Sequence, residues 1–176
     1  MGGGRTARGP LSACTTPEMS VVACSIHIDA PPEKVWELVM DPERLGEWVT
    51  IHRKLLDADE GPPRPGFQMV QSLHLRGVNV TVHWRLIDCR SCELAVWEGR
   101  GPARSRARTE YHIEREGDGT RFDYRNEFHP PLGAVGALAS RALARGVPER
   151  EAKMTLARLR NLMERPVTAA GDNRTG

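Results

Sequence analysis

The stretch that decides the fold runs from residue 20 to residue 48 and reads SVVACSIHIDAPPEKVWELVMDPERLGEW. In its first part the larger apolar side chains fall at every second position, at Val22, Cys24, Ile26 and Ile28. This alternation is typical of a strand with one buried face. The stretch therefore begins with a predicted strand.

Two short helices are predicted to follow this strand. Asp29 is placed as the N-cap of the first helix, and Pro31-Pro32 falls in the first turn, where proline is tolerated. Val35, Trp36, Leu38 and Val39 then share one helical stripe. Asp41-Pro42 ends this helix and begins the second one.

Residues 67–128 read as one strand after another, separated by turn signals. Gly117-Asp118-Gly119 is the strongest of these signals and predicts a tight hairpin. Charged residues occupy the alternate positions of the last two strands, which predicts one wet face with pairs across the hairpin and one dry face. The residues predicted to face inward along these strands are Phe67, Met69, Gln71, Leu73, Leu75, Val78, Val80, Val82, Trp84, Leu86, Ala107, Thr109, Tyr111, Ile113, Phe122, Tyr124, Asn126 and Phe128.

Residues 132–165 have a helical pattern that is interrupted at Gly146-Val147-Pro148. A proline inside a helix removes a backbone hydrogen bond and costs about 3 kcal/mol, so a kink or a break is expected there. Alternatively, Pro148 begins a second helix in its first turn. The sequence leaves both possibilities open.

The length of 176 residues suits one domain, predicted at 20–165, between disordered tails at 1–19 and 166–176, with Met19 as a candidate native start. The net charge of +2 gives no indication of a nucleic-acid partner. No apolar run is long enough for a membrane span, and residues 2–17 lack the apolar region of a secretory signal. Four cysteines without such a signal predict a reducing, cytoplasmic location and no disulfide framework.

The order strand, helix, helix, strands, long helix resembles the START-like superfamily, also called SRPBCC or birch-pollen-allergen-like. The residues that carry the resemblance are 28–36 (IDAPPEKVW), 41–45 (DPERL), Glu47-Trp48, 117–120 (GDGT) and 131–133 (PLG). The resemblance spans roughly 20–165 and is greatest to the bacterial polyketide cyclase/dehydrase branch. Within that branch, 48–52 (WVTIH) is similar to small actinobacterial members, some of them proposed as toxins of toxin–antitoxin pairs.

The resemblance implies an α+β helix-grip fold, in which a curved antiparallel sheet of about seven strands wraps around a long C-terminal helix. It also implies an apolar cavity between sheet and helix, which in relatives holds lipids, sterols, polyketides or hormones. Several inward positions are polar, and pockets usually combine apolar walls with a few such groups. The residues expected to line the cavity are Trp48, Met69, Gln71, Leu73, Val80, Trp84, Thr109, Tyr111, Tyr124, Asn126, Phe128, Leu138, Arg141 and Ala142.

Three functions remain open at this point. The leading one is binding or carriage of a small hydrophobic molecule by a monomer or weak homodimer. The second is an aromatase/cyclase-like enzyme, with Tyr111 or Tyr124 as phenol and Arg141 or Arg145 polarising a carbonyl, although no two residues have the spacing of a catalytic pair. The third is an interaction protein of the toxin–antitoxin type.

No cofactor or metal is expected. Cys89-Arg90-Ser91-Cys92 is a lone CxxC in a predicted strand–strand turn, whereas a zinc ribbon needs a second pair and a redox site needs a helix N-terminus. The six histidines form no metal-binding motif. Among them, His52 is of most interest, because it lies within the segment that resembles the family.

Overall fold

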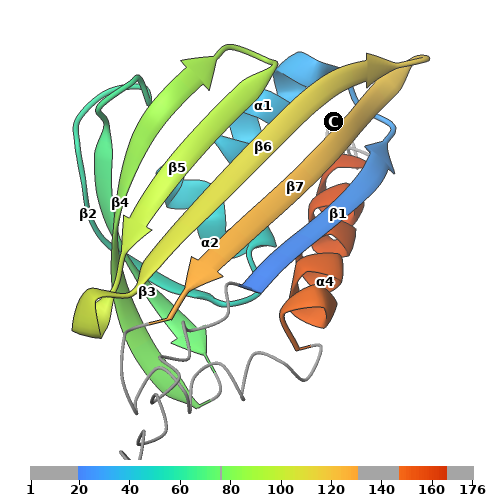
Figure 1. The fold of residues 1–176 in the computed structure, drawn as a ribbon. Coiled ribbons are helices and arrows are strands. Elements are labelled where there is room, and N and C mark those ends of the chain that lie inside the picture. Colours follow the sequence, from blue (N-terminus) through green and yellow to red (C-terminus); the bar gives the residue numbers. More distant parts are fainter. Residues whose placement is uncertain (1–19, 76, 131–146, 166–176) are drawn as a thin grey trace, which may run out of the picture.

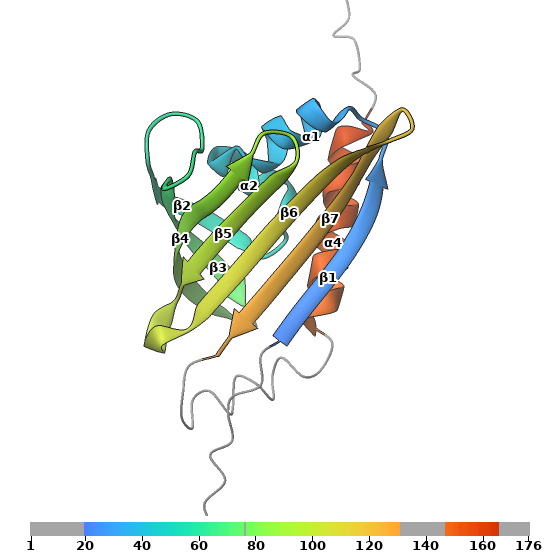
Figure 2. The same cartoon turned by 45° about the horizontal axis from the view of Figure 1, so that its top comes forward.

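The computed structural model describes residues 20–75, 77–130 and 147–165, with backbone alone at 147 and 148. It is built around one curved, fully antiparallel sheet of seven strands in the order β1-β7-β6-β5-β4-β3-β2 (Figure 1). The helices lie together on the concave side of this sheet (Figure 2). The predicted α+β helix-grip architecture is therefore confirmed.

Each strand of the meander follows its predecessor in the chain, except that β1 adds to the edge beside β7. The elements, in chain order, are β1 (Ser20–Ile28), α1 (Pro32–Val39), η1 (Pro42–Arg44), α2 (Leu45–Trp48), β2 (His52–Ala58), β3 (Gln68–Leu75), β4 (Val78–Arg90), β5 (Leu94–Arg100), η2 (Pro102–Arg104), β6 (Arg106–Glu116), β7 (Gly119–His129) and α4 (Val147–Met163).

The curvature of the sheet has a local cause in the strand pairing. The register shifts twice between β2 and β3 and once between β4 and β5, at Leu86/Asp88. An extra residue on one strand of a pair bends that strand and increases its twist. The bends bring the inner faces of β3 and β4 round toward the helices, and a concave surface results.

The start of α1 differs from the prediction. Pro31 is the N-cap, no side chain caps the helix, and Pro32 is its first residue. Asp29 is not the cap, because its Oδ1 lies 3.1 Å from His27 Nε2 instead. The predicted start of the second short helix at Asp41-Pro42 is confirmed. Asp41 Oδ1 accepts a hydrogen bond of 2.9 Å from the Glu43 backbone N–H at the start of η1.

The turns between strands follow the glycine signals. Gly117, in the hairpin between β6 and β7, has φ +61°, a value that suits glycine. At Gly119 an added Cβ would lie 2.5 Å from the carbonyl oxygen of Ile28, so only glycine lets β1 approach β7 this closely. Cys92 lies in the turn between β4 and β5, as predicted, whereas Cys89 lies near the end of β4, and both are free thiols.

Helix α4 packs against β1 and α2 through its buried residues Ala152, Thr155, Leu156 and Leu159. Its Thr155 hydroxyl lies 2.9 Å from the Thr50 hydroxyl, which ties the helix to the segment before β2. Pro148 lies in the first turn of α4. The predicted interruption at 146–148 cannot be placed against a preceding helix, because 131–146 lie outside the described residues.

No helix in the described parts of the chain is both long and apolar enough to cross a membrane.

Candidate functional site

The inner face of the sheet brings together most of the residues predicted to line a cavity. Strand pairing sets Met69 beside Trp84, Gln71 beside Val82 and Leu73 beside Val80. On the other side it sets Thr109 beside Asn126, and Tyr111 beside Tyr124. Trp48 reaches this face from α2. Leu138, Arg141 and Ala142, together with Arg145, lie outside the described residues.

The inner face divides into two halves. The half nearest α1 and α2, here called the packed half, is closed by fully buried side chains: Ile28, Val35, Leu38, Trp48 and Phe122. Trp48 meets Tyr111 and Phe122 edge-on there, with ring centroids 5.8 and 6.4 Å apart. These contacts belong to the main hydrophobic core of the protein.

The other half, here called the open half, is only partly covered. Its members, from β4, β6 and β7, are half-buried although they face inward: Val80, Ala107, Tyr124, Asn126 and Phe128. Leu75 and Val78, predicted to face inward, lie beyond it at the tip of the β3–β4 hairpin and are 37% and 62% exposed. The sequence pattern placed these two side chains on the correct face, but the strands extend past the helices that would bury them.

A polar cluster lies at the centre of the open half. Asn126 Nδ2 donates a hydrogen bond of 3.1 Å to Tyr124 Oη. The Tyr124 and Tyr111 rings stack with their centroids 6.0 Å apart. Burial raises the pKa of Tyr124 to about 12, against the opposite influence of its hydrogen bonds with Asn126 and Thr109. Burial also raises the pKa of Tyr111. Both phenols therefore stay protonated near neutral pH.

Two polar atoms of the inner face have no hydrogen-bond partner among the described residues, although both are buried: Asn126 Oδ1 and Trp84 Nε1. Trp48 Nε1 shares this property within the packed half. A buried polar atom without a partner costs about 1–3 kcal/mol, and such atoms are rare in native proteins. Asn126 and Trp84 are thus an acceptor and a donor held ready on a largely apolar surface.

The position of the Trp84 ring depends on a glycine in the neighbouring strand. Gly99 of β5 pairs with Trp84 of β4, and a Cβ on Gly99 would lie 2.8 Å from Trp84 Cζ3. The ring therefore rests over the Gly99 backbone. Ala107, the next residue along this row, is also small. The row ends at Phe128, so the surface between Trp84 and Phe128 carries only small side chains.

A second polar pair lies on the same face near α2. Gln71 Nε2 lies 2.7 Å from His52 Nδ1. Burial lowers the pKa of His52, which favours the neutral ring. With Nδ1 accepting from Gln71, the ring proton of neutral His52 resides on Nε2. His52 was of interest in the sequence, and the structure gives it a definite partner.

The inward side chains of the sheet are better suited to hydrogen bonding with a ligand than to proton transfer. The inward side chains described on β3, β6 and β7 include no carboxylate. Among the described residues, no group of three His, Cys, Asp or Glu side chains is placed to hold a metal ion. The arrangement suits the orientation of a ligand in an apolar setting.

Trp97 also faces inward, although little in the sequence indicates it. Its ring meets Phe67 edge-on, with centroids 6.2 Å apart. Residues 94–97 are all buried, so alternation did not reveal which of them point inward. Only the pairing of Trp97 with Leu86 and Thr109 identifies its face.

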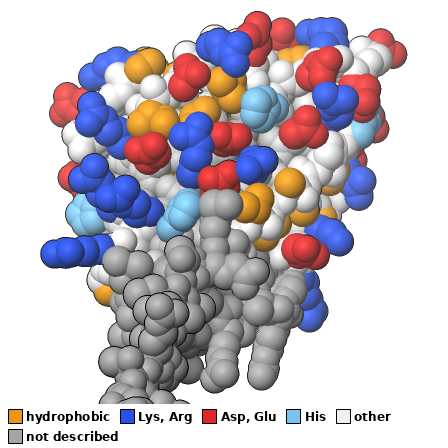
Figure 3. Space-filling view, in the orientation of Figure 1, with side chains coloured by type: hydrophobic (Ala, Val, Ile, Leu, Met, Phe, Trp, Pro, Cys, Tyr) orange, Lys and Arg blue, Asp and Glu red, His pale blue; other side chains and the backbone are white. Residues whose placement is uncertain are grey.

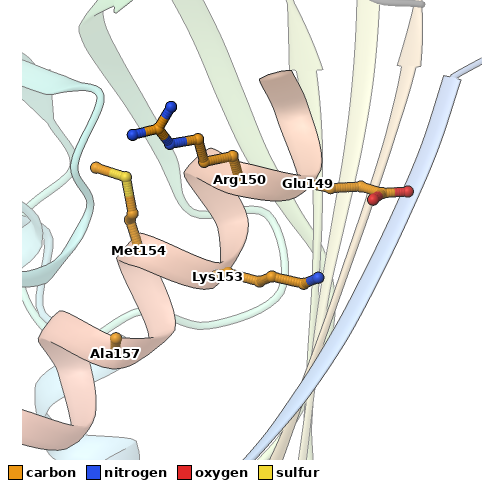
Figure 4. Close-up of a pocket in the computed structure, with 5 residues that line it drawn as sticks. All are labelled: Glu149, Arg150, Lys153, Met154 and Ala157. Carbon is orange, nitrogen blue, oxygen red and sulfur yellow. The ribbon is translucent and has the colours of Figure 1, made fainter. Parts of the chain in front are cut away.

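A shallow surface hollow of about 440 Å³ lies on α4 (Figure 4). It is lined by Glu149, Arg150, Lys153, Met154 and Ala157. Glu149 and Lys153 extend toward β1, whereas Arg150 and Met154 point to the other side of the helix. Three of the five lining side chains are charged, which does not suit an apolar ligand.

Comparison with known proteins agrees with this fold. Among solved structures, the Zhui aromatase/cyclase from Streptomyces sp. R1128 aligns with a TM-score of 0.71 at 20% identity, covering 88% of this chain and 99% of that one. The protein TTHA0849 from Thermus thermophilus aligns with a TM-score of 0.66 at 20% identity, covering 81% and 95%. At these identities the likeness concerns the fold alone.

The di-domain ARO/CYC BexL of the BE-7585A biosynthetic pathway aligns with a TM-score of 0.63 at 19% identity, covering 84% of this chain and 51% of that one. No curated protein matches the chain. Residues 19–164 match the family described as "Polyketide cyclase / dehydrase and lipid transport". Because this match spans most of the sequence, the chain belongs to that polyketide cyclase/dehydrase and lipid transport family.

Proposed function

We propose that the protein binds and carries a small hydrophobic molecule on the open half of its inner face. The observation that supports this most is the unpartnered Asn126 Oδ1 on this half-covered apolar surface. A second unpartnered atom, Nε1 of the buried Trp84, lies in the row that continues through Gly99 and Ala107 to Phe128. A ligand there gains apolar contact with Val80, Ala107 and Phe128, and satisfies both atoms at once.

The two atoms also define the polarity of the proposed ligand. Trp84 Nε1 is a donor and calls for a carbonyl or ether oxygen. Asn126 Oδ1 is an acceptor and calls for a hydroxyl or N–H group. The ligand we propose is therefore an apolar skeleton with at least one oxygen acceptor and one hydroxyl, a description that fits lipids and polyketide-like aromatics. The remaining residues proposed for contact are Trp48, Met69, Gln71, Leu73, Thr109, Tyr111 and Tyr124.

Binding without chemistry is favoured over catalysis by the titration behaviour of the site. General acid–base catalysis works best with a pKa near the operating pH. Burial holds the pKa of Tyr124 at about 12, and Gln71 already occupies Nδ1 of His52. These groups donate hydrogen bonds well and transfer protons poorly at neutral pH.

An aromatase/cyclase-like activity is the second candidate. The family description includes polyketide cyclases and dehydrases, and the Zhui structure carries the name aromatase/cyclase. In this case the Tyr124 phenol would donate to a ketone oxygen and favour its enol, while the apolar walls fold the chain. Formation of a cyclised aromatic product from a polyketone mimic, lost in Tyr124→Phe, would favour this candidate over carriage.

Calorimetric titration with fatty acids, sterols and hydroxylated aromatic ketones tests the binding proposal. Asn126→Leu and Trp84→Phe each remove one of the unpartnered atoms and are expected to weaken binding about tenfold, since one hydrogen bond in a dry site is worth roughly 1–2 kcal/mol. Asn161→Leu on exposed α4 and Trp36→Phe on α1 are matched controls that should leave affinity unchanged. Equal weakening in the controls, or no binding by any of the three ligand classes, would contradict the proposal.

A further inference from the structure

The outer face of the sheet is mostly a surface of paired charges. Arg121 Nε lies 3.3 Å from Asp123 and its Nη2 contacts Glu114 across the hairpin, as the sequence predicted. Arg108 contacts both Glu98 and Glu110, at 3.7 and 2.7 Å. Figure 3 shows this face with acidic and basic side chains intermixed over much of its area.

One row across this face departs from that pattern. Strand pairing places His83 of β4 beside Arg100 of β5, Arg100 beside Arg106 of β6, and Arg106 beside His129 of β7. This row (His83, Arg100, Arg106, His129), here called the cationic row after its two arginines, contains no carboxylate. Like charges directly opposite on neighbouring strands destabilise a sheet, so the Arg100–Arg106 pair is unfavourable by itself.

The arginines of this region also lack the partners that other arginines of the face have. Among the described residues, no carboxylate oxygen lies within 4.0 Å of the guanidinium nitrogens of Arg85, Arg100, Arg104 or Arg106. Glu98, the cross-strand neighbour of Arg85, lies 3.7 Å from Arg108. Glu127 contacts Arg125 and lies 4.0 Å from His129. Within the described part of the chain, these four guanidinium groups therefore form no ion pair of their own.

A hollow of about 720 Å³ adjoins the row at the β4 and β5 end. Its polar lining includes His83, Arg85, Arg100, Gln68 and Glu98, and the loop residues Pro65 and Gly66 form one side. This volume lies within the range of small-molecule sites, about 300–1,000 Å³. Figure 3 shows Lys or Arg side chains and histidine side chains close together on the left of the outer face.

The turn after β5 adds a further arginine to this region. Ala103 and Arg104 have φ of +53° and +64°, in the left-handed region that non-glycine residues rarely adopt. Ser105 holds this turn closed, because its hydroxyl donates a hydrogen bond of 2.8 Å to the Pro102 carbonyl. Such strain is maintained only where the surrounding structure fixes it, and it is concentrated at functional sites.

We propose that the cationic row and its hollow form a binding site for a small polyanion that carries two or more phosphate groups. Guanidinium groups hold phosphate oxygens in pairs of parallel hydrogen bonds, and several neighbouring ones suit a ligand with several charges. Bound phosphate also relieves the Arg100–Arg106 repulsion. The site lies on the opposite face of the sheet from the proposed hydrophobic site and does not depend on it.

Calorimetric titration of the whole chain with inorganic tripolyphosphate at low salt tests this inference. Arg100→Gln and Arg106→Gln are expected to weaken binding about tenfold each, because each removes one charge-assisted contact. Arg121→Gln is the matched control, since its guanidinium already has two carboxylate partners. A loss of affinity in the control equal to that in the two variants would overturn the proposal.

Thermal unfolding provides a readout that does not depend on the choice of polyanion. Arg100→Gln without ligand should unfold at a higher temperature than the unsubstituted protein, because it removes a like-charge pair. A lower unfolding temperature would mean that Arg100 has a stabilising partner and would contradict the inference. Tighter binding of duplex DNA or of acidic lipid vesicles than of tripolyphosphate, lost in the same two variants, would also overturn it and identify a macromolecular surface.

Discussion

The packed and open halves of the inner face are built from the same strands and differ in how they are covered. On β7, Phe122 is fully buried beneath Trp48, whereas Phe128, six residues further along, is only half-buried. Tyr111 packs against Trp48 and Phe122, whereas Tyr124 ends in a hydrogen bond to an amide whose oxygen has no partner among the described residues.

This difference assigns the packed half mainly to the stability of the fold and the open half to the proposed recognition of a ligand. Close-packed apolar contacts near α1 and α2 hold the sheet and the helices together. Away from those helices, the same alternating strand pattern continues with side chains that are only half-buried, among them Tyr124 and Asn126. An unpartnered buried polar atom lowers stability. The packed half has one, Trp48 Nε1, within close-packed apolar contacts, whereas Asn126 Oδ1 lies among half-buried side chains that offer little such compensation.

The largest expected effect distinguishes the two halves by stability. Phe122→Ala leaves a cavity beneath Trp48 and should lower the free energy of unfolding by about 3–5 kcal/mol. Phe128→Ala removes the same side chain from the open half and should cost less than half as much. Urea denaturation of both variants measures this contrast, and equal losses would mean that the two halves are packed alike.

A smaller effect is expected from filling the space beneath Trp84. Gly99→Ala places a methyl group 2.8 Å from Trp84 Cζ3, so the ring must move. Overpacking of this kind costs about 1–3 kcal/mol. The displaced indole should also weaken ligand binding, measured by the same titration as Trp84→Phe. Gly66→Ala, where φ is +93° but no atom lies within 4 Å, tests backbone strain separately from crowding.

Two threonine substitutions, one in each half, test what a single side-chain hydrogen bond contributes there. Thr120 Oγ1 donates a bond of 2.6 Å to the Ala30 carbonyl at the packed end. Thr120→Val should lower the free energy of unfolding by about 1–2 kcal/mol, since it leaves a buried carbonyl without that donor. Thr109→Val, in the open half, should affect ligand affinity more than stability. Denaturation and ligand titration of both variants measure the two effects. A larger loss of stability in Thr109→Val than in Thr120→Val would contradict this division of the inner face.

The smallest effect expected is a change in how the free energy of unfolding depends on pH. Burial lowers the pKa of His52 below its ordinary value, so the unfolded chain binds a proton more readily than the folded one. The stability linked to neutral His52 is therefore complete above the ordinary histidine pKa and is lost as pH falls toward the folded pKa. His52→Gln should reduce the loss of stability between pH 8 and pH 5, measured by denaturant midpoints at about those two values.

His27 is the control for this measurement, because its pKa is shifted the other way. Its hydrogen bond to Glu116 raises the pKa, so its contribution is present at low pH and is lost as pH rises through the folded pKa. His27→Gln should therefore increase the loss of stability on acidification. If both variants changed the pH dependence in the same direction, burial of His52 would not be its cause.

The sequence predicted the strands well, because alternation and glycine turns are local signals. It predicted the inward positions of Met69, Gln71, Trp84 and Tyr124 for the same reason. It missed the face of Trp97, since four successive buried residues conceal the alternation. It also placed the cap of α1 at Asp29, because capping propensity does not reveal that His27 holds this carboxylate.

The sequence did not predict that the inner face divides into a packed half and an open half. Which residues remain half-buried depends on where α1, α2 and α4 end over the sheet, and this is a long-range property. The unpartnered state of Asn126 Oδ1 depends in turn on the direction of its amide toward Tyr124. The cationic row likewise becomes visible only when strand register brings Arg100 beside Arg106.

Native mass spectrometry of the protein after incubation with a total lipid and metabolite extract of its own host tests the central claim most directly. The account predicts one hydrophobic, oxygen-bearing molecule per chain, retained by the unsubstituted protein and by Asn161→Leu but lost from Asn126→Leu. A mass without any bound molecule, or equal retention by both variants, would contradict the claim that the open half is a ligand site.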